Sequence, residues 1–463
     1  MTAAVRRQVT AYAAYAAART PLLTPPAALL VTFVMLSRPQ LSALAVGAMV
    51  LGLLAVSGPG NGSLFLVPVG LLGAVQTGGP VPALGGVAAV AVAAAVALSG
   101  RSTVTPVGVT APRAYGGPHR WIAVLAALLL VSFFFPAERS ASSSIYDITG
   151  MLAGLVLLSA VTAFPPSPGG IARVTAVAGS LTGAYVLAVG DHADGRLDGL
   201  GLNPNYLGAM LVLPLVAAVG LTRRTHRAGW LVPAAVCGAG IVATQSRGAF
   251  LASVAGIAVV LLQGRSLASK AVVLAVMAAA GAVLPGIFGT AEHFVSGPRP
   301  SAQLSSNTSA REHAARFAAD VAIAHPLRGI GYGMFPAHAA KSPVLGLYIA
   351  THDDYLRLAA ESGVLTLVVF LALLWLGVRG RPPGDLAVLR AVVVGYAVGL
   401  FFANQLANLV VSMPFWLSLG CLLASPPGHH PTASDRREES RKHDRQPDRD
   451  QGGRTLRVRP ELV

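Results

Sequence analysis

Long apolar runs recur along most of this chain, and they limit its fold more strongly than any other feature. Of its 463 residues, 54% are hydrophobic and only 11% are charged. A helix needs about 20 apolar residues to cross a bilayer, and it satisfies its own backbone polar groups there. The runs therefore predict an all-α, polytopic integral membrane protein with about 12 to 14 transmembrane helices.

The predicted membrane segments lie near residues 21–37, 41–57, 63–78, 81–99, 119–136, 145–164, 171–190, 203–221, 228–245, 247–263, 268–288, 354–378, 386–403 and 408–424. This pattern divides the chain into four regions. We expect a transmembrane bundle over 1–288, an extracytoplasmic loop with short helices over 289–353, C-terminal transmembrane helices over 354–424, and a disordered cytoplasmic tail over 425–463.

The distribution of positive charge predicts the orientation. Lys and Arg gather in alternate connections, such as "TRRTHR", and in the charged tail, as they do in cytoplasmic loops. We therefore expect a multi-pass protein of the cell membrane with both termini in the cytoplasm. The same segments explain the net charge of +15, so we expect the lipid bilayer as a partner and no nucleic acid.

Four polar clusters fall on the outer face in this topology, and each predicts the start of a helix. Two are "GLNPNYLG", with Asn203 as the cap, and "TQSRGAF", with Ser246 as the cap. In the third, Ser309 and Glu312 fit a capping box that would put Arg311 in the first turn. In the fourth, "YIATHDDYLRLAAESG", Thr351 would start a helix at His352.

Two arginines in these clusters point to an anionic ligand. Arg247 and Arg311 would stand at positive helix ends, where a cation is unfavourable by about 0.3–1 kcal/mol. Helix N-termini bind anions, an arginine at membrane depth marks a candidate functional site, and guanidinium suits phosphate. We predict a phosphate or diphosphate site here. Alternatively, Arg247 anchors its helix at the interface and Arg311 lies on a solvated helix face.

The remaining candidates have both structural and functional interpretations. Asn203 and Asn205 fit a cap and an interhelical contact, or a supporting role in the site together with Ser246 and Tyr355. The glycines of "HPLRGIGYG", Gly329 and Gly331 among them, fit tight turns or a close approach to a ligand. His352 fits a core histidine or a catalytic one. Arg357 and Glu361, four residues apart, are expected to form a local ion pair.

The order of the clusters resembles the O-antigen ligase/O-antigen polymerase-like family of polytopic membrane proteins. The matching pieces are "NPNYLG", "SRGAF", an Arg-bearing helix leading into "HPLRGIGYGMF", and "HDDYLRLAAESGVLTLVVFLALL", which together span roughly 200–378. The chain departs from the family at Asp353, where the family usually has Asn after the histidine. This departure affects the expected local hydrogen bonding.

The resemblance implies a GT-C-like, inverting glycosyltransferase that needs no metal or other cofactor and acts on the extracytoplasmic face. Its donor would be a glycan on an undecaprenyl-diphosphate lipid, and its acceptor a hydroxyl of another glycan or a glycolipid. Arg247 and Arg311 would hold the diphosphate. His352 would activate the acceptor, with Asp353 or Asp354 orienting the imidazole or acting as the base.

Other functions are compatible with some of these features. His352, Asp353 and Asp354 could instead form a divalent-metal site. A transporter or flippase of an anionic lipid-linked glycan would also need many helices and buried arginines, although transporters usually place charges near the bilayer midplane. An inactive scaffold is a third possibility, and the sequence does not separate a ligase from a polymerase.

Overall fold

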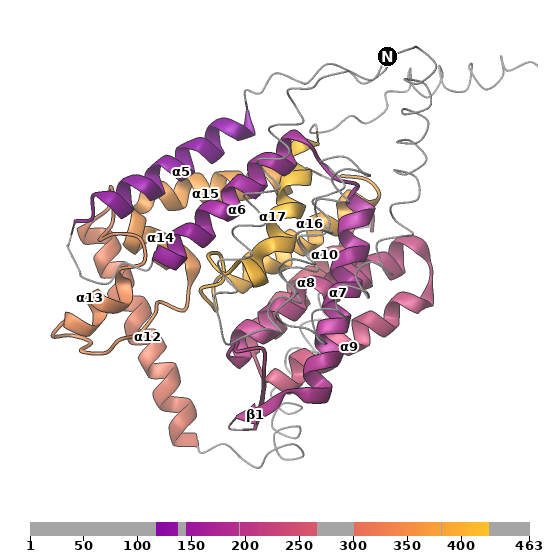
Figure 1. Cartoon of the computed structure of the whole chain (residues 1–463), viewed down its shortest axis with the longest axis horizontal. Helices are drawn as coiled ribbons and strands as arrows, with labels where there is room; N and C mark the ends of the chain where they lie inside the picture. Colours follow the sequence, from indigo (N-terminus) through magenta and orange to yellow (C-terminus); the bar gives the residue numbers. More distant parts are fainter. Residues whose placement is uncertain (1–116, 138–144, 194, 266–300, 381, 426–463) are drawn as a thin grey trace, which may run out of the picture. The chain divides into compact units, whose positions relative to one another are not determined.

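The computed structural model describes residues 117–137, 145–193, 195–265, 301–380 and 382–425 (Figure 1). Its elements are, in order, α5 (Pro118–Phe134), α6 (Ile145–Ala163), α7 (Pro168–Val189), β1 (Asp191–Ala193), β2 (Arg196–Asp198), α8 (Pro204–Thr225), η4 (Ala228–Trp230), α9 (Leu231–Thr244), α10 (Arg247–Leu262), α12 (Ser301–Ala324), α13 (Phe335–Lys341), α14 (Asp354–Ser362), α15 (Val364–Val378), α16 (Asp385–Gly399) and α17 (Leu409–Ala424).

The helical character of the predicted segments is confirmed wherever the structure describes them. Helices cover each predicted membrane segment from 119–136 to 247–263 and from 354–378 to 408–424. The segments 21–37, 41–57, 63–78, 81–99 and 268–288 lie outside the described residues, as do both termini and the tail from 426 onward. The described part is therefore helical except for one two-stranded sheet and the connections.

Membrane crossing is supported by two of the described helices. By length and composition, α7 and α8 are long and apolar enough to span a bilayer. Six further apolar stretches are shorter: Pro118–Phe134, Asp147–Ala163, Ala228–Thr244, Arg247–Leu262, Val364–Val378 and Leu409–Ala424. The number of spans and the four-region division stay predictions.

Helix α8 is the centre of one tightly packed group. It packs against α7, α9, α10 and α16. Small residues permit this approach: a Cβ added to Gly256 on α10 would lie 2.5 Å from Val216 of α8, and one added to Gly395 on α16 would lie 3.1 Å from the carbonyl oxygen of Ala252. Since side chains larger than hydrogen would separate these backbones, the glycines let α8, α10 and α16 meet.

A short hairpin, which the sequence did not predict, lies between α7 and α8. Strands β1 and β2 pair antiparallel, with Asp191 opposite Asp198 and His192 opposite Leu197. Positive φ at Gly195 (71°) allows the tight reversal. The hairpin brings Arg196 back over the start of α8.

The predicted segment 354–378 is two helices rather than one. Helix α14 ends at Gly363, which has φ of 88°, and α15 begins at the next residue. A Cβ on Gly363 would lie 2.5 Å from the carbonyl carbon of Leu327, because the loop before α13 packs at this break. The amide of Val364 also donates to the carbonyl of Pro326 (2.7 Å). The loop is thus fixed to the α14–α15 junction.

A buried ionic cluster completes this attachment. The Glu361 carboxylate accepts hydrogen bonds from Arg357 Nε (2.9 Å) and from the amides of Gly333 (2.9 Å) and Phe335 (3.0 Å). Arg357 also pairs with Asp147 on α6 at 2.6 Å. The predicted Arg357–Glu361 pair is confirmed, and its further partners make it a link between the loop, α14 and α6.

Candidate active site

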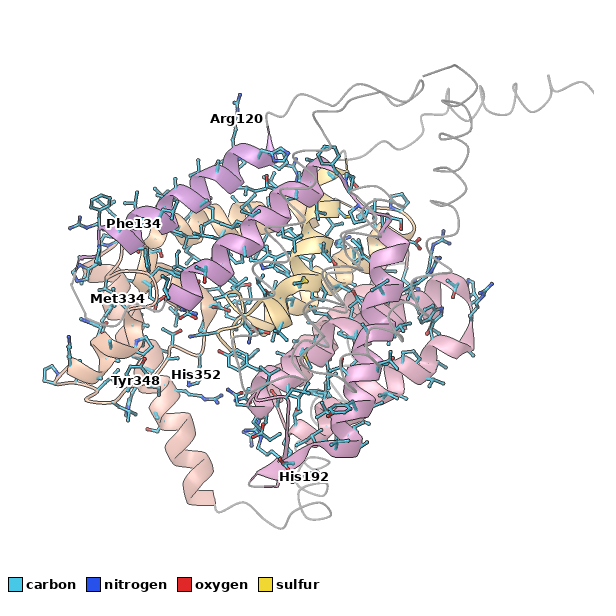
Figure 2. All side chains as sticks on the ribbon, in the orientation of Figure 1. Arg120, Phe134, His192, Met334, Tyr348 and His352 are labelled. Atoms are coloured by element: carbon cyan, nitrogen blue, oxygen red, sulfur yellow. The ribbon has the colours of Figure 1, made fainter. Side chains whose placement is uncertain are left out.

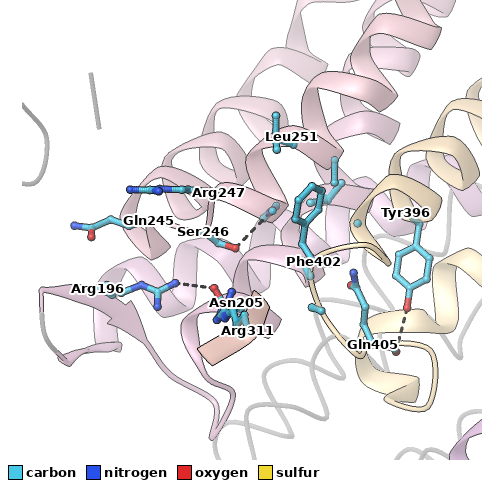
Figure 3. A pocket seen from close by; sticks show the side chains of 17 residues that line it. Arg196, Asn205, Gln245, Ser246, Arg247, Leu251, Arg311, Tyr396, Phe402 and Gln405 are labelled. Carbon is cyan, nitrogen blue, oxygen red and sulfur yellow. Dashed lines mark hydrogen bonds between the residues drawn. The ribbon is translucent and has the colours of Figure 1, made fainter. Parts of the chain in front are cut away.

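A cavity of about 380 Å³ opens where the N-terminal ends of α8 and α10 and the C-terminal end of α16 meet α12 and the hairpin (Figure 3). Its polar lining consists of Arg196, Asn205, Gln245, Ser246, Arg247, Arg311, Tyr396 and Gln405. Arg247, Arg311, Asn205 and Ser246 were predicted for the site. Three guanidinium groups therefore share one cavity, which suits a ligand with several negative charges.

The first two predicted helix starts are confirmed. Asn203 Oδ1 accepts from the amides of Asn205 (3.0 Å) and Tyr206 (3.1 Å), with Pro204 at the first helical position. Ser246 Oγ accepts from the amide of Ala249 (3.4 Å) and caps α10. Asn203 is thus a structural cap. Ser246 caps the helix that begins with Arg247, one of the two arginines predicted for the site.

Arg247 is the first residue of α10 and lies at a positive helix end, as predicted. Its side chain is exposed at the cavity and makes no hydrogen bond to the residues that the structure describes. An unpaired cation at such a position is available to a negative ligand.

The predicted helix start at Ser309 is wrong. Helix α12 begins at Ser301, so Ser309 lies inside it and Arg311 is far from the first turn. The capping box is a local signal, but no Gly or Pro interrupts residues 301–324, so the helix continues upstream. Glu312 pairs with Arg316 instead. The helix-dipole argument therefore applies to Arg247 and not to Arg311, although Arg311 does reach the cavity.

Arg196 is a cavity cation that the sequence analysis missed. Its Nε donates to the Thr244 carbonyl (2.8 Å), and its second terminal nitrogen donates to Asn205 Oδ1 (2.8 Å). These bonds tie the hairpin to the start of α8 and the end of α9. Asn205 therefore holds the Arg196 guanidinium in place. Only the position of "DGRLDG", which is separated by two residues from the following "LNPNYLG", hinted at this neighbour.

His352 precedes α14, in the connection that follows α13 (Figure 2). The predicted helix start at His352 is wrong, because this residue has φ of 55° in the left-handed region and α14 begins at Asp354. Non-glycine residues rarely adopt that conformation, and those that do cluster at functional sites. Its imidazole has no hydrogen-bond partner in the described part of the chain.

Electrostatics couples His352 to the arginine cavity. Burial and, to a smaller extent, the nearby Arg311 cation together lower the pKa of His352 to about 4. The imidazole is therefore neutral at pH 7 and can accept a proton or a hydrogen bond. His352 itself is not among the side chains that line the cavity.

The two aspartates after His352 bind backbone amides. Asp353, not Thr351, caps α14, with Oδ1 accepting from the amides of Tyr355 (2.8 Å) and Leu356 (3.0 Å). Aspartate is the stronger cap of the two, which explains the shift. Burial raises the pKa of Asp353, and the two amide bonds partly offset this rise. Asp354 is 1% exposed and accepts from the amides of Gln405 (2.6 Å) and Leu406 (2.9 Å).

The connection between α16 and α17 forms another wall that the sequence analysis missed. It places Phe402, Ala403 and Gln405 at the cavity, and Asp354 holds its backbone. Tyr206 donates to the Asn404 carbonyl at 2.7 Å, which joins this connection to α8. The available signal was the amide-rich "ANQLAN" between two apolar segments.

Three of the remaining predicted residues pack away from the cavity lining. Gly329 and Gly331 have φ of 64° and 122°, and a Cβ on Gly329 would lie 2.2 Å from the carbonyl carbon of Glu361. Their freedom serves the approach of the loop to α14. The Tyr355 hydroxyl donates to the Ala397 carbonyl (2.7 Å) and so contacts α16. Among the described residues no three His, Cys, Asp or Glu side chains gather as a metal site.

Comparison with protein families identifies residues 231–371 with the family model described as O-antigen ligase. The match contains Arg247, Arg311 and His352, whereas Arg196 and Gln405 lie outside it. The resemblance to an O-antigen ligase-like family is thereby confirmed over these residues, and at the level of the family it supports a ligase- or transferase-type enzyme. No curated protein matches the chain.

Proposed function

The chain carries an O-antigen ligase-like domain over residues 231–371, and we propose that it transfers a glycan from an undecaprenyl-diphosphate-type lipid onto a hydroxyl of an acceptor glycan or glycolipid. The reaction takes place on the extracytoplasmic face. The observation that carries this proposal is the convergence of Arg196, Arg247 and Arg311 on one cavity whose charge is matched by a diphosphate.

The arginines stabilise the leaving group. When the bond between the sugar and the diphosphate breaks, negative charge grows on the phosphate oxygens. Arg247 meets that charge with a guanidinium that makes no hydrogen bond to the described residues and with the amide end of α10, while Arg311 approaches from α12. Fixed cations of this kind stabilise developing charge without reorganising, so the reaction proceeds without a metal ion.

His352 activates the acceptor. Its neutral imidazole accepts the proton of the acceptor hydroxyl, whose oxygen attacks the anomeric carbon of the donor sugar. One carbon–oxygen bond forms as the bond to the diphosphate breaks, and the electron pair leaves with the lipid diphosphate. Attack opposite the leaving group inverts the anomeric configuration.

Binding of the donor increases the basicity of His352. In the free protein the Arg311 cation disfavours the imidazolium. A bound diphosphate neutralises that cation and adds negative charge, so the pKa of His352 rises toward neutrality. The base becomes strongest when the donor is in place, which couples acceptor activation to donor binding.

Reconstitution tests this function directly. The purified protein is placed in liposomes with an undecaprenyl-diphosphate-linked oligosaccharide and a glycolipid acceptor, and the products are followed by mass spectrometry. We expect covalent transfer that EDTA does not inhibit. Movement of the intact lipid across the bilayer without covalent change would instead indicate a transporter or flippase.

Substitutions locate the chemistry. Arg247→Ala, Arg311→Ala and His352→Ala should each lower turnover by about 100-fold or more, as expected for lost charge stabilisation or lost base catalysis. The matched controls are Arg227→Ala and His313→Ala, since both are exposed and neither lines the cavity. Full activity in the three site variants would show that the site lies elsewhere.

A further inference from the structure

Gln405 is a buried amide at the arginine cavity that has an unused acceptor. The residue is 1% exposed and lines the cavity. Its Oε1 has no hydrogen-bond partner among the residues that the structure describes. Buried polar atoms are nearly always paired in folded proteins, so an unpaired one beside a cavity marks a place for a ligand atom.

The backbone of Gln405 is held on both sides, which fixes where its side chain lies. Its amide donates to Asp354 Oδ2 at 2.6 Å, and its carbonyl accepts from the Tyr396 hydroxyl at 3.0 Å. Tyr396 is itself stacked on Phe415, with ring centroids 4.5 Å apart. Helices α14 and α16 therefore hold the backbone of Gln405, and neither of these two bonds involves its side chain.

The neighbouring glycine leaves space for this amide. A Cβ added to Gly399 would lie 2.9 Å from Gln405 Nε2, and Gly399 also lines the cavity. Any larger side chain at this position would push against the amide group. The side chain thus occupies a space that the surrounding backbone keeps open.

The cavity has two chemically different sides. Figure 3 shows Arg196, Arg247 and Arg311 on one side and Tyr396, Phe402 and Gln405 on the other. The arginine side is complementary to a diphosphate. The opposite side offers an uncharged amide, which can accept a hydrogen bond from a hydroxyl group, and two aromatic side chains, which supply apolar contact area.

We infer that Gln405 recognises a hydroxyl or N-acyl group of the sugar attached directly to the donor diphosphate. This inference rests on the proposed function and adds a sugar subsite to it. The amide Oε1 accepts a hydrogen bond from the sugar while the diphosphate lies against the arginines. Gln405 is a specificity residue in this role, and the reacting atoms stay with the arginines and His352.

Comparing the binding of two ligands distinguishes the sugar subsite from the diphosphate site. Undecaprenyl diphosphate and undecaprenyl diphosphate carrying one N-acetylglucosamine are titrated against the full-length protein in nanodiscs. The readout is the ratio of the two dissociation constants. In the wild type the sugar should tighten binding about fivefold to tenfold, the size of one buried hydrogen bond.

Two substitutions test the amide. Gln405→Leu removes the acceptor and should bring the ratio close to 1. Gln405→Glu keeps an oxygen at the same position, so it should keep the ratio. Its negative charge should weaken the binding of both ligands. The control is Gln263→Leu, which removes an amide that donates to the Ala387 carbonyl (2.8 Å) and does not line this cavity. It should leave the ratio unchanged.

Each result has one meaning. An equal ratio in wild type and Gln405→Leu, or a wild-type ratio of 1, overturns the sugar subsite and leaves the diphosphate site intact. Failure of undecaprenyl diphosphate itself to bind the wild type overturns the proposed function instead. Because a ratio compares two ligands on the same folded protein, partial loss of folded material in a variant does not change it.

Discussion

Replacing Arg311 with glutamine should raise the pKa of His352, because the Arg311 cation is one of two causes that lower it. The gap between the ordinary value of 6.5 and the value of about 4 corresponds to roughly 3 kcal/mol against the imidazolium. Partial exposure of His352 to solvent reduces this to about 1–2 kcal/mol. Burial is the larger cause, so Arg311→Gln should bring the pKa only part of the way back toward 6.5.

Acylation by diethyl pyrocarbonate measures this pKa, since the reagent attacks neutral imidazole. The rate of labelling at the peptide that contains His352 is followed by mass spectrometry from pH 3 to pH 8. His313, an exposed histidine on α12, serves as an internal reference for reagent decay. Inorganic pyrophosphate, added as a mimic of the donor diphosphate, should raise the midpoint in the wild type.

The same shift makes protein stability depend on pH. The folded-state pKa of His352 lies below that of the unfolded chain, so the unfolded chain binds the proton more tightly. The contribution of His352 to the free energy of unfolding is fully present above about pH 6.5, and it is lost as the pH drops toward about 4. His352→Asn should remove this part of the decline in thermal unfolding experiments.

Specific outcomes would refute the reasoning. A wild-type labelling midpoint between pH 6 and pH 7 would show that His352 is neither buried nor close to a cation. An unchanged midpoint in Arg311→Gln would show that Arg311 is too distant to act on the imidazole. No response to pyrophosphate would separate His352 from the anion site.

Three further predictions concern the supports of the site. Glu361→Ala should lower the free energy of unfolding by about 3–5 kcal/mol in denaturant titrations, because it leaves Arg357 without one of its buried partners; a loss below 1 kcal/mol would contradict this. Gly329→Ala should cost about 1–3 kcal/mol, since φ is positive and the new Cβ meets the α14 backbone, and an unchanged melting temperature would argue against the observed loop path. Arg196→Ala should weaken pyrophosphate binding and expose the hairpin to proteolysis, whereas Arg227→Ala should do neither.

Local signals predicted much of the fold. Apolar runs located the helices because length and hydropathy are properties of a single segment. Asn203 and Ser246 marked true helix starts because a cap acts within three residues of itself. The same kind of signal failed at Ser309, where the helix begins eight residues earlier at Ser301 and the capping pattern lies inside it.

Long-range contacts account for what the sequence did not reveal. Arg196 joins the cavity through Thr244, 48 residues later, and Gln405 joins it through Asp354, 51 residues earlier. No pattern within a window of one helix relates such partners. The break at Gly363 likewise depends on Leu327, which packs against it from the loop. Such residues become visible as site components only when the packing is known.

The departure at Asp353 from the asparagine typical of the resembled family can now be interpreted through its contacts. Asp353 uses one oxygen, Oδ1, to accept both amide hydrogen bonds at the start of α14. The side-chain oxygen of asparagine can accept the same two bonds, and the two residues are about equally good caps. The hydrogen bonding at this position therefore does not require a carboxylate. What the cap does require is extended backbone at Asp353, directly after the left-handed turn at His352. A capping residue at 353 thus fixes His352 directly before the start of α14. This explains how a substitution beside the proposed base can preserve the position of the histidine.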